Sequence, residues 1–105
     1  MSSILVIDTS NNKKIKIGLI INGKKKIVTS DSKNLRSQTC LLLIDKILRE
    51  KKLEPKDLSQ IRINTGPGSF TGLRVGIAIA NALSYLLQIP INRKKIGDLE
   101  EPVYN

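Results

Sequence analysis

The sequence predicts an α/β protein in which helices pack on a mixed β-sheet, with the element order β-β-β-α-β-α. Two observations carry this prediction. Short apolar or alternating segments, which are typical of strands, fill the first third of the chain. Two longer segments with helical periodicity follow, separated by one more short alternating segment. A hairpin followed by alternating helix and strand favours a mixed sheet covered by helices. The 105 residues are enough for one small domain.

The strand predictions rest on local pattern and turn residues. Residues 3–7 (SILVI) form a continuous apolar run followed by turn residues, which predicts a buried central strand. From residue 14, isoleucines alternate with lysines at the period of a half-buried strand. Asn22 and Gly23 both tolerate positive φ and therefore predict a tight hairpin turn, with residues 24–29 as the return strand. Residues 31–36 predict a loop, and residues 60–64 a fourth strand.

Helical periodicity starts at about Ser37 and predicts a first helix with apolar residues at positions 40, 41, 44, 47 and 48. The lone cysteine, Cys40, is expected to be a small buried hydrophobe. Residues 54–58 predict a linker with a single turn. The second helix runs from about Ser69 or Phe70 to Gln88, and residues 89–91 end it and begin one more short strand.

Composition restricts the function classes. Eighteen basic against nine acidic residues give a net charge of +9, which indicates either a solvated surface or attraction to an acidic partner such as RNA. With no histidine and one cysteine, we expect no metal, no cofactor and no disulfide framework within the chain. The apolar run 75–91 is interrupted by polar residues and is short for a membrane span. The N-terminus does not resemble a signal peptide. We therefore expect a cytoplasmic location and no membrane partner.

The segment TGPGSFTGLR raises the question of a phosphate-binding loop. Neither register fits the P-loop motif, and Thr71 stands where a dinucleotide-binding loop would have its third glycine. The simpler interpretation is a tight reversal at Gly66, Pro67 and Gly68, followed by a helix cap from Ser69 with help from Thr71. Anion binding by the free N–H groups of the helix start is the alternative.

The second helix carries a stripe of small side chains, Gly72, Gly76, Ala80 and Ser84, at intervals of four residues. Each glycine costs a helix roughly 1 kcal/mol relative to alanine, so the two glycines require a reason. We expect close approach of another helix, either the first helix or a helix of another chain. The remaining apolar residues are then expected to cover the sheet: Val75, Ile79, Leu83 and Leu86.

Three segments, ILVIDTS, SQTCLLLIDKIL and GPGSFTGLRVGIAIANAL, resemble the TsaB (YeaZ) family over residues 4–91. The resemblance implies one actin-like ATPase (ribonuclease H-like) lobe in a dimerisation subunit of the machinery that forms threonylcarbamoyladenosine in tRNA. It implies no catalysis by this subunit, pairing with the catalytic paralogue TsaD through the two helices, and a TsaE-like ATPase in the larger complex. The partner-binding residues expected on this basis are Leu41, Ile44, Leu48, Gly72, Leu73, Gly76, Ala80 and Ser84.

Two departures from the family pattern accompany the resemblance. We expect residues 1–92 to form the first lobe and residues 93–105 a C-terminal tail, with the family's second lobe absent; Arg36 stands where the family often has histidine. Three alternatives remain open. The chain could be a basic module that recruits tRNA, or a vestigial ATPase that uses Asp8 and the 66–71 turn. The same helical face could also serve a homodimer instead of the complex with TsaD.

Overall fold

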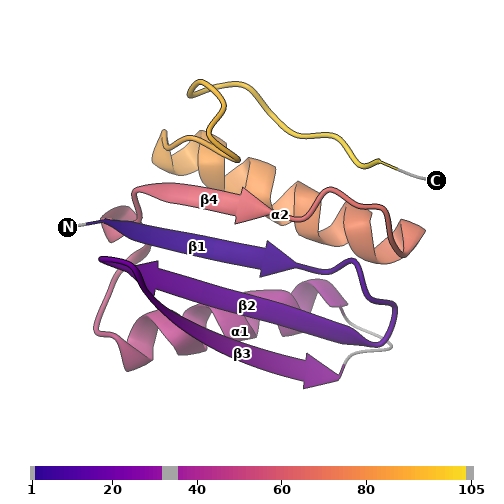
Figure 1. Ribbon diagram of the computed structural model, residues 1–105, viewed down its shortest axis with the longest axis horizontal. Helices are drawn as coiled ribbons and strands as arrows, with labels where there is room; N and C mark the ends of the chain where they lie inside the picture. Colours follow the sequence, from indigo (N-terminus) through magenta and orange to yellow (C-terminus); the bar gives the residue numbers. More distant parts are fainter. Residues whose placement is uncertain (1, 32–35, 104–105) are drawn as a thin grey trace.

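The computed structural model, which describes residues 2–31 and 36–103, confirms the α/β class and the element order (Figure 1). The strands are β1 (Ser3–Asp8), β2 (Lys14–Ile21), β3 (Lys24–Asp31) and β4 (Gln60–Ile63). The helices are α1 (Arg36–Glu50) and α2 (Phe70–Leu87), with a short 3-10 turn, η1 (Pro55–Asp57), where a single turn was expected. Of the predicted 31–36 loop, residues 32–35 lie outside the described residues.

The four strands form one sheet in the order β3-β2-β1-β4. Strand β1 runs antiparallel to β2 and parallel to β4, so the sheet is mixed, and β1 is central as its unbroken apolar run predicts. The β2–β3 hairpin turns at Asn22 and Gly23, whose φ angles of 49° and 85° confirm the prediction from these two residues. The sequence therefore sets the register of the hairpin through its turn.

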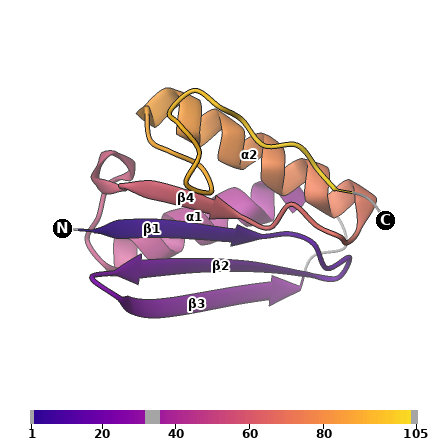
Figure 2. The same cartoon turned by 45° about the horizontal axis from the view of Figure 1, so that its top comes forward.

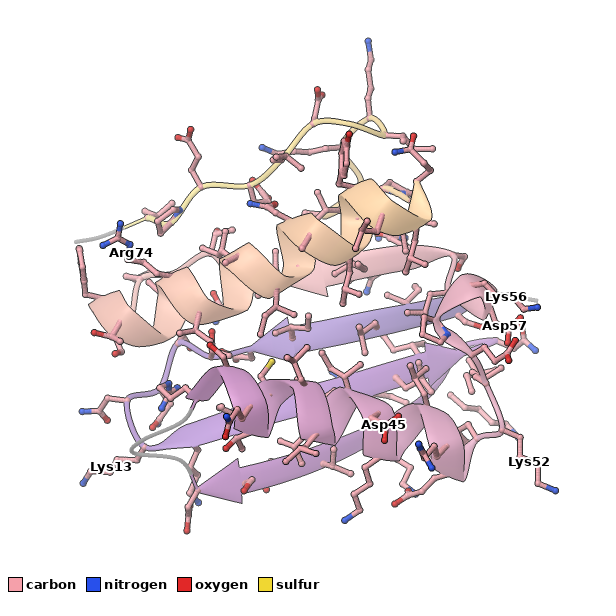
Figure 3. The ribbon with its side chains drawn as sticks, turned by 180° about the vertical axis from the view of Figure 1, so that it is seen from behind. Lys13, Asp45, Lys52, Lys56, Asp57 and Arg74 are labelled. Carbon is pink, nitrogen blue, oxygen red and sulfur yellow. The ribbon has the colours of Figure 1, made fainter. Side chains whose placement is uncertain are left out.

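Both helices cover the same face of the sheet, and the core lies between the two layers (Figures 2 and 3). Alternate residues of the strands point into this core because successive side chains of a strand lie on opposite faces. The strands contribute Leu5, Ile7, Ile15, Ile17, Leu19, Ile61 and Ile63, and the helices contribute Cys40, Leu43, Ile44, Ile47, Leu48, Leu73, Ile77 and Ala80.

The inner side of α1 is aliphatic and includes Cys40, which is fully buried as expected. Burial raises the pKa of the Cys40 thiol to about 11, although the positive charge of Arg36 acts in the opposite direction. By length and composition alone, α2 could cross a membrane. In this fold, however, Leu73, Ile77 and Ala80 of α2 are buried in the core beneath it.

The free edge of β4 is closed by residues that follow α2. Ile91 forms an isolated parallel bridge to Ile61, which reduces the expected short strand to one residue pair. Next to it, the Asn92 amide accepts a hydrogen bond from Ile63 N (2.9 Å) and donates one to Ile63 O (3.0 Å). One side-chain amide thus satisfies both backbone groups that a further strand would use at this position.

From Asn92 the chain turns back along the outer side of α2 (Figure 2). The amide of Asn81 on α2 donates to Glu100 O (3.0 Å) and accepts from Glu100 N (2.9 Å). Near the start of α2, Val103 N donates to Thr65 O (2.7 Å). The tail through Val103 is therefore attached to α2 at Asn81 and to the turn before α2 at Thr65.

Candidate functional site

The glycine-rich turn before α2 is a reversal and helix cap, as the sequence predicts. Gly66 has a φ of 117°, and the hydroxyl of Ser69 accepts a hydrogen bond from Gly72 N (3.3 Å). Thr71 lies exposed in the first helical turn, and among the described residues its hydroxyl makes no capping bond, so the expected help from Thr71 is not found. Gly68 packs on the loop after β1, where an added Cβ would lie 2.7 Å from the Cβ of Ser10.

The two helical glycines are explained by the end of β1. An added Cβ would lie 2.2 Å from Thr9 O at Gly72 and 2.2 Å from Thr9 Oγ1 at Gly76, distances that real Cβ atoms do not show. The Thr9 hydroxyl, fully buried, donates to Gly72 O at 2.6 Å. The close approach that the glycines imply therefore exists, but the neighbour is a threonine of this chain and not a second helix.

The rest of the small-residue stripe, Ala80 and Ser84, faces inward as well, and so does the neighbouring Leu73. Leu73 and Ala80 are fully buried, and Ser84 donates through its hydroxyl to Ile89 O (2.7 Å) beyond the end of the helix. Together with Gly72 and Gly76, these residues pack within the chain and are not accessible to a partner. We therefore correct the expectation that they form a partner-binding surface. Ile44 and Leu48 of α1 are also largely buried.

The larger apolar residues that were expected to cover the sheet lie on one side of α2, which includes Leu83 of the groove beside α1. Val75, Ile79, Leu83 and Leu86 recur at three- and four-residue spacing and share this flank. Ile79 and Leu83 are half-buried and pack against the core, and Leu83 also lines a groove beside α1. Leu86 is 74% exposed, so the prediction that all four residues cover the sheet is wrong for Leu86. The helix is rotated about its axis relative to the prediction.

An apolar groove lies along α1 between Leu83 of α2 and residues 53–55. Figure 3 shows the two helices side by side in the same layer. The volume of the groove is about 490 Å³, and its walls are mainly aliphatic. Three of the predicted partner-binding residues, Leu41, Ile44 and Leu48, line the α1 wall, where Leu41 is 50% exposed. The rim carries Asp45 and Arg49, which form an exposed ion pair at 2.9 Å. Such an apolar floor with a polar rim is typical of a protein-binding surface.

Arg36 is a structural residue whose role the sequence did not reveal. Its guanidinium is largely buried at the start of α1 and donates to the carbonyls of Thr9 (3.2 Å), Asn11 (2.7 Å) and Asn12 (3.2 Å). These bonds hold the loop between β1 and β2 against both helix starts. A single arginine before an apolar helix gives no local signal of such a role, because its partners are backbone atoms remote in sequence.

Asp8, the residue considered for nucleotide chemistry, is engaged within the chain. Its Oδ1 accepts from Ser10 N (3.0 Å), Ser10 Oγ (2.6 Å) and Asn64 Nδ2 (3.3 Å). Burial raises the pKa of Asp8, but these hydrogen bonds and the charge of Lys16 outweigh burial and hold the pKa below its ordinary value of 3.8. Within residues 2–31 and 36–103, no three His, Cys, Asp or Glu side chains gather as metal ligands would.

Comparison with known proteins identifies the family. Residues 24–93 match the family model described as TsaD, tRNA N6-adenosine threonylcarbamoyltransferase. The tRNA threonylcarbamoyladenosine biosynthesis protein TsaB of Buchnera aphidicola subsp. Schizaphis graminum is 42% identical over 71 residues, covering 65% of this chain and 34% of that protein. TsaB of Bacillus subtilis is 32% identical over 93 residues, covering 86% of this chain and 39% of that protein.

The fold agrees with that of a solved structure. YeaZ from Pseudomonas aeruginosa superimposes with a TM-score of 0.81 and 27% identity, covering 90% of this chain and 44% of that one. The chain thus spans less than half the length of the relatives it matches. The matched family model, the curated relatives and the fold agree, and the chain belongs to the TsaD-type family, where it groups with the TsaB (YeaZ) proteins.

Proposed function

We propose that this chain is a non-catalytic subunit of the machinery that forms threonylcarbamoyladenosine in tRNA, and that it binds a TsaD-like catalytic protein through α1 and α2. The observation that carries the proposal is the open apolar groove between the two helices. The family match supplies the pathway, since the curated relatives are named for tRNA threonylcarbamoyladenosine biosynthesis. In this proposal residues 1–92 form the docking lobe, and the tail from residue 93 braces α2.

The docking surface differs from the one that the small-residue stripe suggested. It comprises Leu41 and Leu83, which line the groove, and the half-buried or exposed residues that share the side of α2 with Leu83 at helical spacing, namely Val75, Ile79 and Leu86. Burying such side chains against a partner removes apolar area from water, at about 25 cal/mol per Å². A few central aliphatic residues of this kind usually carry most of the binding free energy.

The absence of catalysis by this subunit is part of the proposal. The chain has no histidine, and the carboxylate nearest the start of a nucleotide loop, that of Asp8, is held by Ser10 and Asn64. The chemical step then belongs to the TsaD-like partner. A TsaE-like ATPase would join the larger assembly through that partner or through surfaces outside the groove.

A paired variant tests the docking surface. In Leu41→Gln/Leu86→Gln both changes lie at exposed positions, Leu41 in the groove wall and Leu86 one turn after Leu83 on α2, so the fold should be retained. We expect its affinity for the TsaD-like protein, measured by titration calorimetry, to fall by about thirtyfold or more. The matched control, Ile27→Gln/Tyr85→Gln, removes two equally exposed apolar side chains away from the groove and should bind as the unchanged chain does.

Two results would contradict the proposal. One is an unchanged affinity of the groove variant; the other is an equal loss in groove and control variants. A homodimer is the competing use of the same face. Sedimentation velocity of the chain alone separates the two, because a homodimer predicts a concentration-dependent dimer that the groove variant abolishes and that the TsaD-like protein does not displace.

A further inference from the structure

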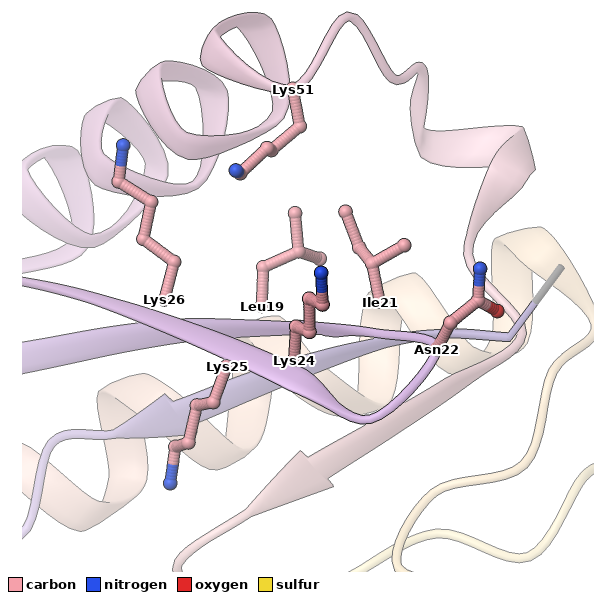
Figure 4. Close-up of a pocket in the computed structure, with 7 residues that line it drawn as sticks. All are labelled: Leu19, Ile21, Asn22, Lys24, Lys25, Lys26 and Lys51. Carbon is pink, nitrogen blue, oxygen red and sulfur yellow. The ribbon is translucent and has the colours of Figure 1, made fainter.

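Four lysines gather where the β2–β3 hairpin meets the end of α1 (Figure 4). Lys24, Lys25 and Lys26 come from β3, and Lys51 is the first residue after α1. Together with an apolar floor that includes Leu19, they line a depression of about 370 Å³, which we call the lysine pocket. Two segments distant in the sequence therefore converge, so that Lys24, Lys26 and Lys51 lie around the depression while Lys25 extends from the other side of the hairpin.

The strand register explains how the lysines are presented. Lys24 pairs with Ile21 and Lys26 with Leu19, so these two lysines share the helix-facing side of the sheet with core residue Leu19. Lys25 points to the opposite side, as Figure 4 shows. The hairpin end is thus cationic on both faces, and Lys51 adds a charge from the helix layer.

Little negative charge neutralises this cluster. Lys26 pairs with Glu50, whereas Lys24, Lys25 and Lys51 form no ion pair with any residue in the described ranges. The hydrogen bond from Lys26 lowers the pKa of Glu50, and the charges of Lys46 and Lys51 act in the same direction. The local potential is therefore positive, and like charges so close together favour binding of an anion.

We propose that the lysine pocket binds backbone phosphates of RNA. The proposal rests on the proposed function above, because it is the family's tRNA pathway that makes RNA the favoured polyanion. Ammonium groups act as compact point charges and suit phosphates approached from several directions. The pocket has no aromatic side chain for base stacking, so the contact is with phosphates and carries no base specificity of its own.

The variant Lys24→Gln/Lys25→Gln/Lys51→Gln tests this site, with Lys26 kept to retain its bond to Glu50. The probe is unfractionated tRNA, and its binding is measured by fluorescence anisotropy from 50 to 200 mM salt. We expect the slope of log K against log salt to fall in magnitude by about 2–3 and the affinity at 50 mM salt to fall by about tenfold. Unchanged thermal melting of the variant shows that its fold is intact.

A matched control removes three cations from the opposite end of the molecule. In Lys13→Gln/Lys14→Gln/Arg74→Gln the net charge changes equally, and Figure 3 shows Lys13 and Arg74 far from Lys52, the neighbour of Lys51. We expect at most about a threefold loss of affinity. An equal loss in both variants would mean that only net charge matters, and absence of tRNA binding at 50 mM salt would overturn the site outright.

An acidic protein is the competing occupant, and polyglutamate serves as its probe. If polyglutamate displaces tRNA at equal charge concentration, the assignment of the lysine pocket to phosphates is wrong. If tRNA stays bound in the presence of polyglutamate, the assignment is supported. The same lysine variant should bind the TsaD-like protein with unchanged affinity. Binding of tRNA through these lysines without binding of a TsaD-like protein would support the RNA site and refute the docking proposal. Binding of a TsaD-like protein without binding of tRNA would support the docking proposal and refute the RNA site.

Discussion

The two flanks of α2 differ in the size of their side chains and in what covers them. The inner flank has Gly72, Gly76 and Ala80, which lie against the end of β1 and the sheet. The flank that carries Leu83 of the groove has Ile79 and Leu86, which are partly or largely exposed. The difference teaches that small residues mark the closest contact inside the chain. The large residues of the other flank are the ones that we propose contact another chain.

The largest effect should come from filling the inner flank. Gly76→Val places methyl groups where Thr9 already lies, so the free energy of unfolding should fall by about 3 kcal/mol in urea denaturation. Ala78→Val, two residues along on an exposed position, is the control and should change stability by no more than about 0.7 kcal/mol. A Gly76→Val chain of normal stability that fails to bind its partner would reverse our assignment of the two flanks.

A buried and an exposed arginine are expected to differ in their contribution to stability, with an effect smaller than that of Gly76→Val. Arg36→Met leaves the carbonyls of Thr9 and Asn11 without their donor and should lower the free energy of unfolding by about 2 kcal/mol. Arg49→Met breaks only the exposed pair with Asp45 and should cost at most about 0.5 kcal/mol. Thermal and urea unfolding of both variants measure the difference. Similar losses would show that Arg36 does not hold the β1–β2 loop.

The smallest effect concerns pH at the strand end beside the inner flank. The folded pKa of Asp8 lies below its ordinary value of 3.8, which applies to the unfolded chain. The ionised carboxylate therefore stabilises the fold fully above pH 3.8, and this contribution is lost as the pH falls through the folded pKa. Asp8→Asn should lower stability by at most about 1 kcal/mol at pH 7, since the site is partly open to solvent. The gap between the two proteins should close as the pH falls below 3.8 and through the lowered folded pKa of Asp8. A gap that widens on acidification would contradict the assigned direction.

Local signals predicted most of the fold. Asn22-Gly23 determined the hairpin, Ser69 marked the start of α2, and the unbroken SILVI run identified the central strand. These features depend on a few neighbouring residues, so the sequence displays them directly. Ser69 alone caps α2, so the nearby Thr71 was not needed to predict where the helix begins.

The candidate site was harder to predict because its geometry depends on distant residues. The small stripe and the larger aliphatic stripe of α2 both recur at helical spacing, and periodicity cannot say which one faces the sheet. That choice follows from Thr9, which lies more than sixty residues earlier and whose hydroxyl bonds to Gly72 O. Arg36 was missed for the same reason, since its partners are backbone carbonyls of a distant loop.

The two margins of the sheet also differ in whether a further strand can be added. Asn92 and Ile91 already occupy the β4 margin, whereas β3 is the outermost strand at the other. The lysines of β3 repel a second molecule approaching that margin, as charged edge strands commonly do. In concentrated solutions with enough salt to screen those charges, we expect fibrillar self-association to begin at β3. Purification of this protein should therefore favour dilute, low-salt buffers.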